Sequence, residues 1–212
     1  MTPTIKNRLQ LSGVTPEAIE KLKIYVDLIL QWNKAINLVS PATIPQIWER
    51  HILDSAQLWP IISQHAGKGS RIVDLGSGGG LPALVLAIMG ADHVTMVESD
   101  KRKCIFLQEA SRETKLTNVT IVNERIENVS GVKAPIVTAR ALAPLLSLTA
   151  WASPLIEPGG IMLFPKGQDW QEEINGLTEH FSEDLVGNIE KFQSITDKDA
   201  KIVLIHTPSC FM

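Results

Sequence analysis

The fold of this chain is decided by residues 72–82, which read I-V-D-L-G-S-G-G-G-L-P. A short apolar run ends in Asp74, and three glycines follow at alternate positions, Gly76, Gly78 and Gly80. An apolar run typical of a helix comes next. Glycine is favoured where a chain turns with positive φ and where a ligand approaches bare backbone, and a helix N-terminus offers unpaired N–H groups. The stretch therefore predicts a strand, a glycine turn and a helix that together hold a polar cofactor.

The spacing of the glycines separates one class of cofactor from the others. A dinucleotide-binding loop needs glycine at the position of Leu81, and a phosphate-binding P-loop needs a lysine that this loop lacks. The remaining pattern resembles the first motif of S-adenosylmethionine-dependent methyltransferases. That resemblance implies that Asp74 lies near the ammonium group of the cofactor, since a carboxylate attracts a cation and repels pyrophosphate. The alternative is a structural glycine turn in another α/β protein.

A second acid follows the loop at an informative distance. Residues 93–98, H-V-T-M-V-E, alternate as a strand does and end in Glu98. In doubly wound folds an acid about 20 residues past the glycine loop binds a ribose, and a carboxylate can accept both hydroxyls of the diol. NAD sites share this feature, and a solvated acid at a strand end is the alternative interpretation.

The remaining pattern is a helical start followed by alternating strands and helices. Thr15-Pro16-Glu17 begins one helix, and residues 47–59 read as another. Strands are predicted at 71–75, 93–98, 118–122, 135–139, 160–165, near 184–193 and at 201–207, with helices at 81–89, 101–115, 144–156 and 169–180. Pro158-Gly159-Gly160 is expected to form a turn before its strand. Such alternation predicts a parallel sheet, and the last two strands predict an antiparallel edge.

We therefore expect an α/β, Rossmann-like class I methyltransferase fold with a mostly parallel seven-stranded sheet. An N-terminal helical extension, residues 1–66, would precede an S-adenosylmethionine-binding domain, residues 67–212. Gly67-Lys68-Gly69 marks the expected boundary.

Composition indicates in which cellular compartment the protein works and which partners it can bind. No signal peptide is recognised, and the longest apolar run is too short to span a bilayer. Cys104 and Cys210 form no metal-like cluster, so we expect a reduced cytoplasmic compartment, no metal and no membrane contact. The net charge of −3 lacks the basic excess of most nucleic-acid-binding domains, so RNA would have to meet a local basic patch. We expect a monomer.

Several motifs, taken in order, resemble one family. They are W-N-K-A-I-N-L-V-S (32–40), R-H-I-L-D-S (50–55), the glycine loop, R-I-E (125–127), T-A-R-A-L-A (138–143) and P-K-G (165–167). This combination is similar to the glucose-inhibited division protein B family, bacterial guanine-N7 methyltransferases of small-subunit (16S) ribosomal RNA. The chain departs from the family pattern at Ala83, where glycine is frequent, and at Thr138, where serine is usual. Neither departure removes a charged group.

The resemblance, together with the glycine loop and Glu98, implies a set of site residues. S-adenosylmethionine is expected at Asp74, Gly76, Ser77, Gly78, Gly80, Leu81, Glu98, Ile126, Glu127 and Arg140. Ribosomal RNA, free or in the subunit, is expected at Asn37, His51, Arg125 and Lys166, and the catalytic residues would be Arg140 and Lys166. Arg140 and Lys166 both follow predicted strands, at the edge where open α/β sheets bind ligands.

Each RNA-side residue also has an ordinary structural interpretation. His51 is compatible with a buried or capping histidine, and Asn37 with a bond to turn backbone. Arg125 is compatible with an ion pair to Glu124 or Glu127. Two other functions also stay open: a class I methyltransferase acting on a small molecule or protein, and a non-enzymatic, division-associated binding protein.

Overall fold

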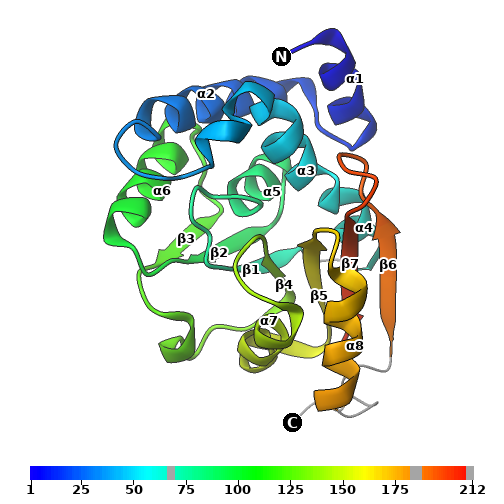
Figure 1. The fold of residues 1–212 in the computed structure, drawn as a ribbon. Helices are drawn as coiled ribbons and strands as arrows, with labels where there is room; N and C mark the ends of the chain where they lie inside the picture. Colours follow the sequence, from blue (N-terminus) through cyan, green and yellow to red (C-terminus); the bar gives the residue numbers. More distant parts are fainter. Residues whose placement is uncertain (66–69, 182–187, 209–212) are drawn as a thin grey trace.

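One sheet of seven strands organises the molecule (Figure 1), whose computed structural model describes residues 1–65, 70–181 and 188–208. The strand order is β3-β2-β1-β4-β5-β7-β6. The strands are β1 (Arg71–Leu75), β2 (His93–Val97), β3 (Val119–Val122), β4 (Ala134–Ala139), β5 (Ile156–Lys166), β6 (Ile189–Gln193) and β7 (Lys201–His206). The α-helices are α1 (Pro3–Leu11), α2 (Pro16–Trp32), α3 (Asp54–Ala56), α4 (Leu58–His65), α5 (Ala83–Met89), α6 (Lys101–Glu113), α7 (Leu145–Ala152) and α8 (Trp170–His180).

Strand directions confirm the predicted sheet. The first five strands in chain order pair in parallel, whereas β7 runs antiparallel to both β5 and β6. The reversed strand is therefore the second from the edge, and the final hairpin supplies the predicted antiparallel edge. Because the strand order reverses between β1 and β4, the carboxyl ends of these two strands flank the crevice in which open α/β sheets bind ligands.

Alternate residues of each strand enter two hydrophobic clusters on opposite faces of the sheet. In β1, Ile72 packs with α2, α5 and α6, whereas Val73 and Leu75 pack with α7 and α8. Figure 1 shows the same division, with α5 and α6 above the sheet and α7 and α8 below it. Side chains in a strand alternate between faces, and a strand that presents Ile72 to one face and Val73 and Leu75 to the other suits a sheet covered on both faces.

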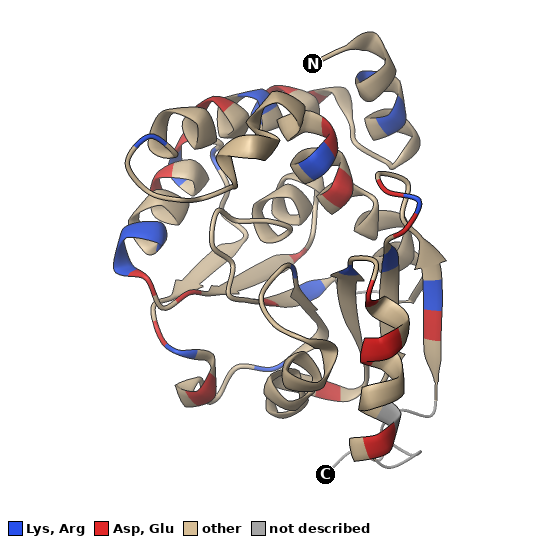
Figure 2. Ribbon diagram, viewed as in Figure 1, with Lys and Arg blue, Asp and Glu red and all other residues tan. Residues whose placement is uncertain are grey.

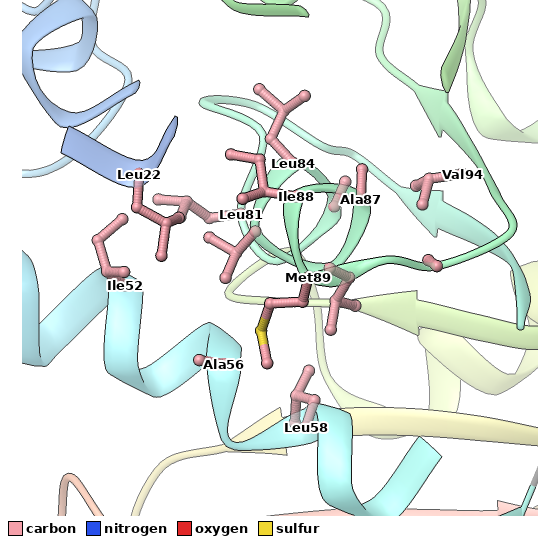
Figure 3. Close-up of a cluster of buried hydrophobic side chains, with 14 of the residues drawn as sticks. Leu22, Ile52, Ala56, Leu58, Leu81, Leu84, Ala87, Ile88, Met89 and Val94 are labelled. Carbon is pink, nitrogen blue, oxygen red and sulfur yellow. The ribbon is translucent and has the colours of Figure 1, made fainter. Parts of the chain in front are cut away.

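The N-terminal helices are part of the upper cluster. Leu22 of α2 and Ile52 lie against the α5 region, where Leu81 and Leu84 are also buried (Figure 3). Ala56 and Leu58 approach Met89 from below in the same view. This burial removes a wide apolar surface of the N-terminal segment from water, at about 25 cal/mol per Å². The expected boundary, Gly67-Lys68-Gly69, lies outside the described residues.

Three local expectations needed correction or completion. The predicted helix 144–156 ends at Ala152, because Pro154 cannot continue it, and β5 begins at Ile156 rather than at 160. The predicted turn at Pro158-Gly159-Gly160 is thus an irregularity within β5, where a Cβ at Gly160 would lie 2.6 Å from the Pro135 carbonyl oxygen. The helix α1 was not predicted separately. Within the described residues, no helix is long and apolar enough to cross a membrane.

Candidate functional site

A cavity of about 440 Å³ opens at the carboxyl edge of the sheet, beside β1, β2, β3 and β4. Loops that follow these strands form its walls, which is the location expected for a ligand site in this type of sheet. Its lining comprises Leu38, Gly76, Ser77, Gly78, Gly79, Leu81, Val97, Glu98, Ser99, Lys103, Glu124, Arg125, Ile126, Glu127, Arg140, Ala141, Leu142 and Trp151. We call it the first cavity.

The glycine loop forms the floor of the first cavity. Gly76 and Gly78 both line the cavity and have φ angles of +60° and +55°, which only glycine adopts readily. Gly80, also predicted to touch the cofactor, faces the other way: a Cβ there would lie 2.5 Å from Leu84 of α5. Gly78 therefore keeps the cavity open, Gly76 allows Leu142 to approach the loop, and Gly80 allows the loop to pack on its helix.

Asp74 lies beneath the loop rather than on the cavity wall. Its side chain is 1% exposed, and its Oδ1 accepts a hydrogen bond from the Thr138 hydroxyl at 2.7 Å. Its Oδ2 is buried and has no hydrogen-bond partner. Burial raises the pKa of this carboxyl to about 6, although the Thr138 hydroxyl and the Arg140 charge both act to lower it. The buried Oδ2 of Asp74 therefore lacks a hydrogen-bond donor, and a cationic group bound at the loop would supply one.

Glu98 lines the first cavity and is held by backbone donors. One of its oxygens accepts from the Gly78 amide at 2.8 Å, and the other accepts from the Asp100 amide at 2.7 Å. Each carboxylate oxygen has a second lone pair, so both remain able to accept a hydroxyl bond from a ligand diol. The predicted second acid is therefore preorganised and tied to the glycine loop.

The loop after β3 closes the far side of the first cavity. Ile126 and Glu127 lie there as predicted for the adenine end, and the neighbouring Arg125 lies there too. Arg125 was expected on the RNA side, but it is exposed and shares the first cavity with the predicted cofactor residues. The basic start of α6, visible in Figure 2, contributes Lys103 to the same cavity.

The N-terminal segment supports the glycine loop from behind. Tyr25 of α2 is completely buried, and its hydroxyl donates to the Gly79 carbonyl at 2.5 Å. Burial raises the pKa of this phenol well above its ordinary range, so it stays a donor. Leu38 lines the first cavity, and its carbonyl oxygen lies 3.1 Å from the position of a Cβ on Gly79. Residues far upstream of the sheet thus shape the cofactor loop.

Replacing Tyr25 with phenylalanine should weaken cofactor binding about threefold to tenfold, because the buried Gly79 carbonyl loses its donor and the loop loses an anchor. Calorimetric titration with S-adenosylmethionine measures this change. Ile29→Val is the matched control: it removes one buried methylene from the same helix, at about 0.5–1.5 kcal/mol of stability, without touching the loop. Equal cofactor affinity in Tyr25→Phe and Ile29→Val would show that the hydroxyl only stabilises the fold.

A second cavity of about 330 Å³ adjoins the first. Arg140 and Ala141 line both cavities, so they stand at the junction. The other lining residues are Thr43, Arg50, His51, Asp54, Gln57, Pro165, Lys166, Gly167, Glu173, Ser194, Thr196, Asp197, Ala200, Lys201 and Ile202. Of the four residues predicted on the RNA side, His51 and Lys166 are brought together here.

Arg140 is held by a stretch of π-helix, Trp48–Leu53. Its Nη2 donates to His51 Nδ1 at 2.7 Å, and its Nη1 donates to Asp54 Oδ2 at 3.0 Å. His51 Nε2–H in turn donates to the Thr43 hydroxyl at 2.7 Å, since that hydroxyl donates onward to the Ser40 carbonyl. π-Helical turns are rare and frequent at functional sites, and this one orients the guanidinium at the junction.

These bonds define the charge state of His51. Burial, together with the positive charges of Arg140 and Arg50, lowers its pKa to about 4. The imidazole is therefore neutral near pH 7, with both ring nitrogens already engaged. His51 contacts the junction of the cavities through Arg140. These contacts fit both interpretations of His51, a satisfied buried histidine and a functional residue.

Asp54 connects this arrangement to the end of the chain. Besides the Arg140 bond, its Oδ1 accepts from the Thr196 hydroxyl at 2.6 Å and from the Gln57 amide at 2.8 Å. The motif R-H-I-L-D-S contains Asp54, but Asp54 was not among the predicted site residues. Its spacing of three from His51 was the available signal, because residues three apart in a helix share a face.

Lys166 lines the second cavity but is already paired. Its Nζ lies 2.7 Å from Glu173 Oε2 of α8 and donates to the Ala143 carbonyl at 3.0 Å. The side chain is only 10% exposed. The same glutamate oxygen accepts from the Leu145 amide at the start of α7. Much of the lysine charge is therefore compensated within the protein.

Asn37 is exposed and lines neither of these two cavities. The turn bonds considered for it belong to Asn33, whose Oδ1 accepts from the amides of Leu38 and Val39 and whose Nδ2 donates to the Val39 carbonyl. Asn33 therefore fixes the turn that carries Leu38 into the first cavity.

Comparison with known sequences identifies the relatives of this chain. The sequence model of a family described as rRNA small subunit methyltransferase G matches residues 18–202. The ribosomal RNA small subunit methyltransferase G of Paramagnetospirillum magneticum is 50% identical over 82% of this chain and 83% of its own length. That of Methylorubrum populi is 41% identical over 97% of this chain and 96% of its own length.

Solved structures share the fold at low sequence identity. A Thermus thermophilus 16S rRNA N2 G1207 methyltransferase, in complex with AdoMet and guanosine, matches with a TM-score of 0.56 and 18% identity over 82% of this chain and 44% of that chain. A putative S-adenosyl-L-methionine-dependent methyltransferase from Methanococcus maripaludis matches with a TM-score of 0.59 and 14% identity over 86% and 92%. The fold is thus that of class I methyltransferases, and the sequence matches show that this chain belongs to the rRNA small subunit methyltransferase G family.

Proposed function

We infer that the protein transfers a methyl group from S-adenosylmethionine to N7 of a guanine in small-subunit (16S) ribosomal RNA. The observation that supports this most is the pair of cavities that meet at Arg140. The first combines the glycine loop with Glu98, which suits a ribose diol, and Asp74, which suits an ammonium group, lies beneath that loop. The second is lined by the family's polar residues. A cofactor in one and a base in the other would meet at the junction.

The residues of the first cavity fit the proposed cofactor. The unpartnered Oδ2 of Asp74 and the preorganised Glu98 carboxylate match its two kinds of donor, and Gly78 leaves room for it. When bound, S-adenosylmethionine supplies the electrophilic methyl group. The protein contributes the placement of the base, which is worth up to about 7–11 kcal/mol where geometry is near ideal.

The charges of the second cavity suit a nucleophile that needs no general base. Guanine N7 carries a lone pair and no proton, so its methylation requires no proton removal before attack. Each of the carboxylates that line this cavity is ion-paired: Asp54 with Arg140, Glu173 with Lys166, and Asp197 with Arg50. His51 is also fully engaged. We propose that Arg140 orients the base through O6, or holds a phosphate beside it.

The target guanine should be unpaired or flipped. N7 faces the major groove, which in an A-form RNA helix is too narrow for side chains to read. Bringing N7 to Arg140 at the junction of the two cavities therefore requires an extruded base. An RNA or a subunit that presents this guanine in a loop would be the preferred substrate.

The direct test is methyl transfer from labelled S-adenosylmethionine to 16S RNA, to small subunits and to a panel of metabolites and proteins. We expect label in one guanine, located by strand cleavage at N7-methylguanosine. Gly78→Val is the negative control, since it places a branched side chain in the first cavity. Labelling of a metabolite or protein instead of RNA would support the alternative methyltransferase. Cofactor binding without any transfer would support the non-enzymatic, division-associated binding protein.

Replacing Lys166 with alanine should weaken RNA binding and leave cofactor affinity unchanged, because a cation of the second cavity is lost and Glu173 is left uncompensated. The slope of affinity against salt should fall by about one phosphate contact. Glu173→Gln should act in the opposite direction, since it frees the lysine charge.

Lys133→Ala provides the control for nonspecific charge effects. Lys133 is exposed and immediately precedes β4, so it lies at the amino end of that strand, whereas both cavities lie at the carboxyl ends. Affinity should be measured at several salt concentrations for all three variants. A Lys166→Ala protein that loses cofactor but retains RNA would remove this lysine from the RNA side.

We further propose the arrangement in which the enzyme works. The N-terminal segment, residues 1–66, would serve as a helical extension of the S-adenosylmethionine-binding domain, residues 67–212, and its contacts with the glycine loop support this. We also propose that the enzyme works as a monomer and meets the ribosomal subunit in the cytoplasm.

A further inference from the structure

Two histidines and a glutamate converge at the edge of the sheet opposite the two cavities. They are His65 at the end of α4, Glu190 in β6 and His206 in β7. Their nearest ligand atoms all lie within 4.8 Å of one another. The position follows from the register: Lys201 of β7 pairs with Lys166 beside the second cavity, whereas His206 pairs with Ile161 at the far end of β5.

Strand register places the two β-residues on one face. Glu190 pairs directly with Leu204, and His206 lies two residues beyond Leu204 on the same side. Leu204 belongs to the cluster that also contains Ile61 and Ile62 of α4, so this face is the one that α4 covers. The three side chains therefore come together because a helix packs on a hairpin, not by sequence proximity.

The tautomer of His65 prepares it as a ligand. Its Nδ1 lies 2.8 Å from the Ile61 carbonyl oxygen, which can only accept, so Nδ1 carries the proton. In the neutral ring Nε2 then holds a lone pair, and it faces Glu190 Oε1 at 3.5 Å. A lone pair opposite a carboxylate is stable only with a proton or a cation between them. Metal-bound histidines commonly have the other ring nitrogen fixed by a carbonyl in this manner.

His206 completes the set. Its Nε2 donates to the same Glu190 Oε1 at 2.7 Å. At Zn–N and Zn–O distances of about 2.0–2.2 Å, neighbouring ligand atoms of a tetrahedral site lie about 3.4 Å apart. The His65–Glu190 distance of 3.5 Å already matches, and the His206–Glu190 pair, at 2.7 Å, must open by about 0.7 Å. Binding moves the Nε2 proton of His206 to its Nδ1 and leaves a lone pair for the metal.

We propose that His65, Glu190 and His206 form a three-ligand Zn²⁺ site, with water in the fourth position, that fastens the β6–β7 hairpin to α4. Two imidazoles and one carboxylate are a donor set that zinc favours and that magnesium and calcium do not. The side chains are 19%, 42% and 30% exposed, so the ion can enter from solvent. Its location at the opposite edge of the sheet gives it a structural role.

The test is zinc binding by the untagged, full-length protein after removal of metals by a chelator. We expect one equivalent to bind in competition with a chromogenic chelator, and the Tm to rise by roughly 5–10 °C when zinc is about 100-fold above its Kd. Mg²⁺ at the same concentration should produce neither effect. His65→Gln, Glu190→Gln and His206→Gln should each weaken zinc binding at least about tenfold.

His180→Gln is the matched control, because His180 lies on α8 and bonds only its own helix carbonyl at Gly176 among the contacts described. Methyl transfer by the apo forms of the three ligand variants should equal that of the apo parent, since none of these residues lines either cavity. The proposal is overturned if the parent binds zinc no more tightly than His65→Gln and His206→Gln do. It is also overturned if the bound equivalent persists in both of these variants. Neither result depends on the RNA reaction.

Discussion

Replacing Arg140 with alanine should lower single-turnover methyl transfer at least about 100-fold, because this guanidinium stands where the two cavities meet and fixes the relative placement of their contents. The change also removes the partner of His51 Nδ1 and of Asp54 Oδ2, whereas Asp54 Oδ1 keeps its bonds from Thr196 and Gln57. We expect stability to fall by about 2 kcal/mol, less than the ~3–5 kcal/mol of a fully buried pair, since the two side chains are 13% and 21% exposed.

A second readout separates loss of function from loss of fold. With Arg140 removed, one of the charges that lower the pKa of His51 is gone, so that pKa should rise from about 4 while burial still holds it below its ordinary value of 6.5. NMR titration of the imidazole measures the shift. Arg140→Lys retains the positive charge but not the planar guanidinium. The His51 pKa of this variant should therefore be closer to the parental value than its single-turnover rate is. A parental single-turnover rate in Arg140→Ala would exclude this residue from the reaction.

Replacing Asp74 with asparagine should weaken cofactor binding at least about tenfold at pH 7.5, because the buried oxygen that lacks a donor no longer carries charge. In the parent protein, cofactor affinity should decline as pH falls through about 6, the pKa of this carboxyl, since protonation removes its attraction for an ammonium group. The variant should lack this decline. Calorimetric titration between pH 5 and pH 8 tests both statements, with exposed Asp92→Asn as the control.

Asp74→Asn should also change how the free energy of unfolding depends on pH. Here we expect the variant to be better than the parent, because it should be more stable near neutral pH. The folded-state pKa of about 6 exceeds the ordinary value of 3.8, so the native protein holds more protons than the unfolded chain between these values. Stability contributed by Asp74 is therefore present below about pH 4 and lost as pH rises through about 6. Relative to the parent, Asp74→Asn should gain up to about 2–3 kcal/mol between pH 4 and pH 7. Urea unfolding at pH 4.5 and pH 7.5 measures this gain, and parallel curves for both proteins would contradict it.

The parts of the site that lie in one contiguous motif were predictable from sequence. The glycine loop and Glu98 follow from the geometry of strand, turn and helix, and the structure places Gly76, Gly78 and Glu98 around one cavity. The roles of Asp74 and Gly80 were less accessible, because the pattern does not say which residue of the loop faces the ligand and which faces the helix behind it. That distinction depends on the backbone direction at each position.

Contacts between distant segments could not be predicted. Nothing in the local sequence pairs Tyr25 with Gly79, Lys166 with Glu173, or Asp54 with Thr196, because each partner is brought in by helix packing or by the final hairpin. One local signal was overlooked: Thr2-Pro3 has the same capping pattern as Thr15-Pro16, and α1 begins there. The chain end that supplies Thr196 and the helix that supplies Tyr25 therefore contributed residues to the site that no motif contained.

The hydrogen bond between Asp54 and Thr196 has a consequence for the order of events during synthesis. Residues 50–54 and Arg140 leave the ribosome well before the segment 194–202, which completes the second cavity. A nascent chain that still lacks this segment has the glycine loop and can assemble the first cavity, but it has no finished chamber for a base. The second cavity can therefore be completed only after residues 194–202 have been synthesised, whereas every residue that lines the first cavity precedes residue 152.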